Sequence, residues 1–112
     1  MDRKETLLRF LEKDPASPFL LFALAKEYEN EENYSRGIEI YEQLLKIDPT
    51  YSGAYYHLGK LYEILDRPDK AKEVYREGLA QCRQQKAWHD ANELQGALNS
   101  LQLPGDAGEE DW

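Results

Sequence analysis

The sequence lacks several features that would indicate a secreted, membrane or nucleic-acid-binding protein. It has one cysteine, Cys82, so an internal disulfide and a cysteine-based zinc site are excluded. No apolar run approaches the roughly 18 residues of a membrane helix, and charges interrupt residues 1–15, where a signal peptide would need an apolar stretch. Only 14 lysines and arginines stand against 22 acidic residues, and the net charge of −8 argues against non-specific nucleic-acid binding. We therefore expect a soluble, cytoplasmic protein without nucleic-acid or membrane partners.

Signals for β-structure are missing as well, because alternating runs of β-branched residues do not occur. Apolar residues recur instead at helical spacing almost throughout. Asp2 with Glu5 forms a capping-box pattern, and Ser17 before Pro18 is a second typical helix start. The predicted helices cover residues 2–13, 18–30, 34–47, 52–65, 68–84 and 87–102. The sequence therefore predicts an all-α chain with short connections, followed by a disordered acidic tail at 104–112.

The chain contains an internal repeat. The helix-ending pair Asp14-Pro15 recurs as Asp48-Pro49. When the chain is shifted so that the first pair falls on the second, apolar, aromatic and charged residues also coincide. The coinciding pairs are Leu24 with Leu58, Lys26 with Lys60, Tyr28 with Tyr62, Glu29 with Glu63, Tyr41 with Tyr75, and Leu45 with Leu79. We expect the hydroxyls of the repeated tyrosines to reach solvent or a partner.

The repeated residues resemble the tetratricopeptide repeat (TPR) pattern, a 34-residue helix pair written W-x2-L-G-x2-Y, A-x3-F, P. The second copy has Tyr55-x2-Leu58-Gly59-x2-Tyr62 followed by Ala71-x3-Tyr75. The first copy has Leu21-x2-Leu24-Ala25-x2-Tyr28, Gly37-x3-Tyr41 and Pro49. The resemblance implies a right-handed α-solenoid of antiparallel helix pairs. It divides one domain, residues 1–103, into a half repeat at 2–15, repeats at 18–51 and 52–85, and a capping helix at 87–102.

Small residues twelve positions apart support this interpretation independently. Ala25 pairs with Gly37 in one copy and Gly59 with Ala71 in the other, so the order changes but the small size is kept. Helices approach closely only where neither side chain is bulky, so we expect a close contact at each pair. Gly78 departs from the pattern at an expected cost of about 1 kcal/mol relative to alanine.

No combination of residues indicates catalysis, a metal or a cofactor. His57 and His89 lack the spacing of paired ligands, and His57 is predicted to lie on a helix surface. Cys82 has no neighbouring base and is expected to act as a small apolar residue at a helix interface. We therefore expect a protein that is not an enzyme.

The resemblance implies that the first helix of each pair lines a concave groove for a partner segment. In this chain the predicted partner-binding residues are Phe19, Phe22, Lys26, Asn30, Tyr56, Lys60, Glu63 and Ile64. Lys26 and Lys60 would hold acidic groups while Phe22 and Tyr56 pack apolar ones. The alternatives are that the lysines pair with Glu29 and Glu63, and that Phe19 and Phe22 pack under the N-terminal helix.

The predicted function is therefore a non-catalytic module that binds a protein or peptide. The two-carboxylate clamp of chaperone-binding relatives is absent, because Phe22, Lys26 and His57 stand at its lysine and asparagine positions. The alternative is a self-association module that forms a homodimer through Trp88, Tyr51 or the N-terminal half repeat.

Overall fold

A computed structural model describes residues 2–102, which form six helices and no strand. The helices are α1 (Arg3–Lys13), α2 (Pro18–Asn30), α3 (Tyr34–Ile47), α4 (Gly53–Ile64), α5 (Pro68–Gln85) and α6 (Trp88–Leu101). The all-α prediction is confirmed, with every helix end within two residues of its predicted position. The predicted tail at 104–112 lies outside the described residues. In this part of the chain no helix combines the length and the apolar character that crossing a membrane requires.

Local sequence explains where the first three helices begin. Asp2 and Glu5 form the predicted capping box at the start of α1. Ser17 accepts a hydrogen bond from the Leu20 amide, with Pro18 in the first position of α2. Asn33 accepts one from the Arg36 amide at the start of α3. These side chains satisfy amide groups that the first turn of a helix leaves without partners.

The second helices of the two pairs differ in length because only one is followed by a proline. Pro49 stands directly after Asp48, which ends α3. Arg83 occupies the corresponding position in the second copy, and α5 continues to Gln85. Lys86 then stops the helix in the left-handed region, with φ of 59°. The absence of one proline thus lengthens α5 to 18 residues, against 14 in α3.

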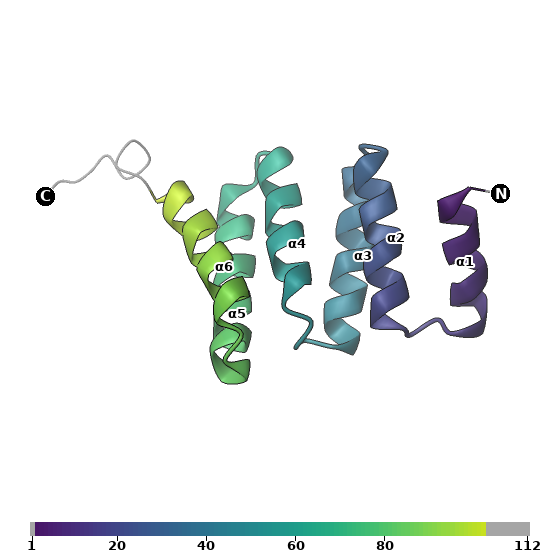
Figure 1. The fold of residues 1–112 in the computed structure, drawn as a ribbon. Coiled ribbons are helices and arrows are strands. Elements are labelled where there is room, and N and C mark those ends of the chain that lie inside the picture. Colours follow the sequence, from purple (N-terminus) through teal and green to yellow (C-terminus); the bar gives the residue numbers. More distant parts are fainter. Residues whose placement is uncertain (1, 103–112) are drawn as a thin grey trace, which may run out of the picture.

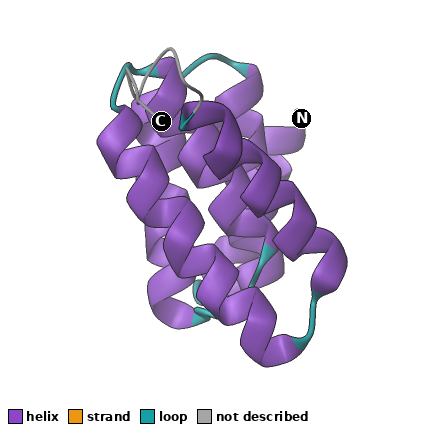
Figure 2. Cartoon of the chain, turned by 90° about the vertical axis from the view of Figure 1, so that its left-hand side faces the viewer, coloured by secondary structure: helices purple, strands orange, loops and turns teal. Residues whose placement is uncertain are grey.

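The helices stack in order along the chain, and short loops connect each helix to the next at the helix ends (Figure 1). The α2–α3 and α4–α5 pairs make extensive contacts, and α4 also packs on α3 and α6. In Figure 1, α2 and α6 stand in front of α3 and α5. Figure 2, turned by 90°, shows the helices running alongside one another. The described chain is an all-α helical repeat solenoid, with principal extents of 55 × 30 × 19 Å.

Three glycines lie at close contacts between helices. A Cβ added to Gly37 would lie 3.7 Å from the Ala25 carbonyl oxygen, which confirms the predicted contact in the first copy. In the second copy the closest neighbour of Gly59 is the ring of Tyr75, one turn beyond Ala71, and an added Cβ would overlap that ring. Both Tyr75 and Ala71 are fully buried, so α4 presses against α5 at this point.

Gly78, which the sequence comparison treats as a departure, has a packing role. An added Cβ would lie 2.6 Å from Tyr55 Cβ and 2.9 Å from Leu94 Cδ1. The first copy has Leu21 and Leu44 at the positions of Tyr55 and Gly78, and both leucines are buried. A large residue on α4 is therefore matched by a very small one on α5, as close packing of the interior requires.

We expect alanine to have opposite effects at different glycines. Gly59→Ala and Gly78→Ala should each destabilise the fold by about 2 kcal/mol or more, because the added methyl group overlaps packed atoms. Gly96→Ala should stabilise it by up to about 1 kcal/mol, because glycine is the poorer helix former and this site is open. Urea unfolding of the three variants measures these changes. Equal stability of all three would contradict the packing described here.

Candidate functional site

The predicted binding residues of α2 occupy different environments. Phe19, in the first turn, is 70% exposed, so α1 does not cover it and that alternative is wrong for this residue. Phe22 and Lys26 are half-buried, and Asn30 is exposed at the end of the helix. Their spacing places the four residues along one stripe of α2.

Phe22 belongs to an aromatic cluster that joins α2 to the next helices. Its ring centroid lies 5.8 Å from that of Tyr41, 5.3 Å from Tyr51 and 5.4 Å from His57. His57 stacks on Tyr41 at 5.9 Å, with an angle of 14° between the rings. Phe22 therefore packs against α3, α4 and the loop before α4. The alternative had placed it under α1 instead.

A polar network lies beside this cluster. Tyr41 donates a hydrogen bond of 2.9 Å to Glu29, and His57 Nδ1 lies 3.6 Å from the same carboxylate. Burial raises the pKa of Glu29, but His57, Tyr41 and the charge of Lys26 together lower it below its ordinary value. His57 lies on α4 and is half-buried, and its ring links α4 to α2 and α3, contacts that the sequence did not predict.

The second copy repeats the hydrogen bond from tyrosine to glutamate. Tyr75 donates to Glu63, and these two residues occupy the repeat positions of Tyr41 and Glu29. The pKa of Tyr75 is raised well above its ordinary value, mainly by burial and next by this hydrogen bond. Glu63, a predicted binding residue, is thus partly engaged within the fold.

Tyr62 makes a similar hydrogen bond between the two copies. It donates to Glu42 of α3, and burial with this bond raises its pKa to about 12. The expectation that the repeated tyrosine hydroxyls reach solvent or a partner is wrong for Tyr41, Tyr62 and Tyr75. Their hydroxyls bind carboxylates of the same chain.

A hollow of about 280 Å³ lies between α4 and α6. Two predicted binding residues of α4 line it, and the Nζ of Lys60 lies 5.5 Å from the ring centroid of Tyr56. The wall from α6 consists of Asn92, Glu93, Gly96, Ala97 and Ser100. This contribution of α6 was not predicted, because the helix lacks the repeat pattern.

The remaining predicted residues lie around this hollow or beyond it. Lys60 pairs with Glu63 at 3.7 Å, which confirms the alternative proposed for that lysine. Glu29, the acid proposed for Lys26, instead contacts Tyr41 and His57. Ile64 is 54% exposed at the end of α4. The structure therefore brings together Tyr56, Lys60 and Glu63, while Phe19, Asn30 and Ile64 stand at the helix ends.

Among the described residues, the first two turns of α6 bring three possible metal ligands together. One ligand atom each from His89, Asp90 and Glu93 lies within 4.8 Å of the others. His89 and Glu93 are exposed, and Asp90 accepts a hydrogen bond from Ser52. Cys82 is buried as predicted, and burial raises the pKa of its thiol, which disfavours the nucleophilic thiolate.

We expect Glu29→Gln to lower the free energy of unfolding by about 1–2 kcal/mol at pH 7, because a charge-assisted network is lost. The pKa of Glu29 lies below its ordinary 4.5 in the folded chain, so its stabilising effect is full above that pH. The difference between wild type and variant should therefore shrink as the pH falls below 4.5 and Glu29 is protonated. Urea unfolding between pH 3 and pH 7 measures it. A difference that does not change with pH would contradict the network's role.

Comparison with protein families gives a match to tetratricopeptide repeat over residues 30–101. The chain is also similar to a tetratricopeptide repeat domain protein from Salinibacter ruber. The crystal structure of that domain has 43% identity and a TM-score of 0.73, and the alignment covers 77% of this chain and 96% of the other. Its solution structure gives 41% identity and a TM-score of 0.74, covering 88% and 94%.

A third similar structure is that of a protein from Bordetella parapertussis. It has 27% identity and a TM-score of 0.80, and the alignment covers 91% of this chain and 89% of the other. A comparison with curated proteins gives no match. The family match extends over more than half of the chain, from the end of α2 to the end of α6. The chain therefore belongs to the tetratricopeptide repeat family.

Proposed function

We propose that this chain is a non-catalytic module that binds a protein segment along the face formed by α2, α4 and α6. The fold of this family generally mediates protein–protein interaction. The observation that carries the proposal is the hollow between α4 and α6, which combines an aromatic ring and a lysine with three small residues of α6 beside Asn92 and Glu93. Gly96 has no side chain and open space beside it, so the main chain of a partner can approach α6 closely there.

The division of the chain into repeats is part of this proposal. A half repeat at 2–15, repeats at 18–51 and 52–85 and a capping helix at 87–102 agree with the recurring bonds Tyr41–Glu29 and Tyr75–Glu63. Under this division, α2 and α4 are the first helices of their pairs, and α6 continues their layer. The partner-binding residues would then be Phe19, Phe22, Lys26, Asn30, Tyr56, Lys60, Glu63 and Ile64.

Self-association is a second candidate, supported by apolar side chains at the two ends of the stack. Phe10 and Leu8 of α1 are 55% and 39% exposed, and Trp88 of α6 is 57% exposed. Tyr51 is less suitable, because it packs on Phe22. Sedimentation at two protein concentrations tests this candidate, which predicts a mass that rises with concentration. A monomer at both concentrations would contradict it.

Reversing two charges should remove partner binding if the proposal is correct. We expect Lys26→Glu with Lys60→Glu to weaken capture of a partner from native lysate by tenfold or more, about 1.4 kcal/mol, with helicity kept. The matched control is Lys72→Glu with Arg76→Glu on α5, which changes the net charge equally. Circular dichroism checks the fold. An unchanged set of captured proteins would remove this face from consideration.

Filling the hollow provides a test without a change of charge. Gly96→Trp should block capture, because the indole would occupy the space beside Tyr56 and Lys60. Asn99→Trp is the control, since Asn99 is exposed on α6 but does not line the hollow. Hydrogen exchange of the captured complex should show protection in α2, α4 and α6. Equal capture by both tryptophan variants would contradict the proposal.

A further inference from the structure

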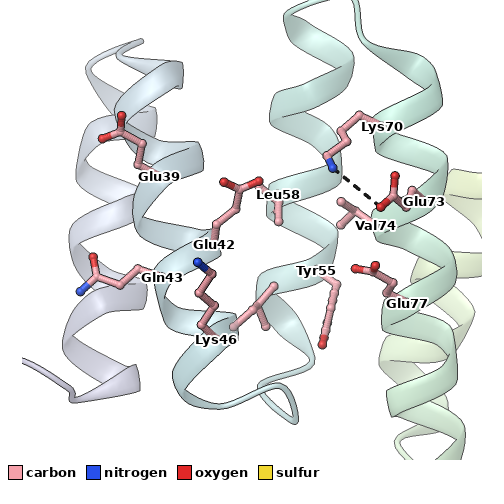
Figure 3. A pocket seen from close by; sticks show the side chains of 11 residues that line it. Glu39, Glu42, Gln43, Lys46, Tyr55, Leu58, Lys70, Glu73, Val74 and Glu77 are labelled. Carbon is pink, nitrogen blue, oxygen red and sulfur yellow. Dashed lines mark ion pairs between the residues drawn. The ribbon is translucent and has the colours of Figure 1, made fainter.

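A larger hollow, of about 600 Å³, lies between α3 and α5 with α4 as its floor (Figure 3). We call it the outer groove. It is lined by Glu39, Glu42, Gln43, Leu45, Lys46, Tyr55, Leu58, Lys70, Glu73, Val74 and Glu77. Tyr55 and Leu58 project from α4 into this groove, whereas Tyr56 and Lys60 line the hollow beside α6. The helical turn of about 100° per residue places these two pairs on opposite sides of α4, so the two hollows are separate surfaces.

The outer groove has acidic walls and an apolar floor. Glu39 and Glu42 project from α3, and Glu73 and Glu77 project from α5 (Figure 3). The apolar floor consists of Tyr55 and Leu58 of α4 with the adjoining Val74 of α5, which are buried, and Leu45 of α3, which is half-buried. Four glutamates against two lysines leave an excess of two negative charges in the lining.

One glutamate of each wall follows the internal repeat. Glu39 and Glu73 occupy the same position in the two copies, and each pairs with a cation three residues earlier. Arg36 lies 2.6 Å from Glu39, and Lys70 lies 3.7 Å from Glu73. Surface pairs of this kind contribute little to stability, so a cation of a partner can replace one at little cost. The carboxylates are therefore available to a partner that brings its own positive charges.

The charge and shape of the groove restrict what it can bind. An anionic ligand or a nucleic acid would meet four carboxylates and be repelled. The described carboxylates of the groove do not converge on a point where one ion could be held by three of them. A volume of about 600 Å³ is within the range of pockets, roughly 300–1,000 Å³, that enclose a small ligand or a few residues of a chain.

We propose that the outer groove binds a short basic segment of a partner protein, with arginine or lysine residues flanking an apolar one. The cationic side chains reach Glu39 on one wall and Glu77 on the other, because Glu42 already accepts the hydrogen bond from Tyr62. The apolar side chain packs on Leu45 and the edge of Val74. Arginine suits this site best, because its planar guanidinium forms two parallel hydrogen bonds with a carboxylate. The net charge of −8 also attracts a basic segment before contact.

Selection from a random-peptide display library tests this proposal. The bait is the full chain carrying Lys60→Glu, which alters the hollow between α4 and α6 and leaves the outer groove unchanged. We expect the selected peptides to contain at least two arginines or lysines around an apolar residue. Their affinity should fall tenfold or more in Glu39→Lys with Glu77→Lys, and should weaken as salt is raised. Both glutamates are exposed, so this variant should keep the fold.

The control is Glu12→Lys with Asp14→Lys, which changes the net charge equally at the end of α1, away from the groove. Binding that survives the groove variant, or that falls equally in the control, would overturn the proposal and indicate attraction to the acidic surface in general. Selection of neutral or acidic peptides, or of none, would also overturn it. This selection tests the outer groove, whereas Gly96→Trp tests the face formed by α2, α4 and α6. Either proposal can therefore fail without the other.

Discussion

The packing of the Tyr75 ring on the backbone of α4 at Gly59 is the constraint on which the rest of the structure depends. The ring occupies the space where any side chain at Gly59 would lie, and its hydroxyl is held by Glu63 one turn further along α4. One residue of α5 is thus fixed to α4 both by contact and by a hydrogen bond. The first copy has Ala25, Glu29 and Tyr41 at the same positions. The two helix pairs therefore take up similar geometry and can stack.

Much of this fold follows from local sequence. Asp2, Ser17 and Asn33 set the starts of α1, α2 and α3, and the internal repeat gives the order of the helices. These features can be predicted from the sequence, because the helix caps depend on residues close in the chain and the repeat depends on the same residue types recurring at a fixed spacing. The family could be named from them, and the comparison confirms it.

The details of the surfaces could not be predicted in the same way. The partners of the tyrosine hydroxyls depend on how far each helix is rotated, although Glu29 and Tyr41 both recur in the repeat. His57 has no counterpart among the repeated residues, so nothing in the sequence indicated its contact with Glu29. Both hollows depend on the gap between helices that are not neighbours in the chain. Their linings became visible only when α4 was placed between α3, α5 and α6.

The stacked pairs give the protein two surfaces of different chemistry. The hollow between α4 and α6 offers a lysine over an aromatic ring, while the outer groove offers carboxylates above an apolar floor. Buried residues of α4 hold both in place, because its opposite sides form part of each. Disturbing the contact between α4 and α5 should therefore alter both surfaces together.

A double-mutant cycle between Gly59→Ala and Tyr75→Leu tests the central constraint most directly. If the ring and the glycine fit one another, the alanine should be strongly destabilising in the wild-type chain and much less so beside leucine. The account predicts a coupling energy of about 1–3 kcal/mol, the range found for residues in direct contact. Additive effects of the two substitutions would contradict it.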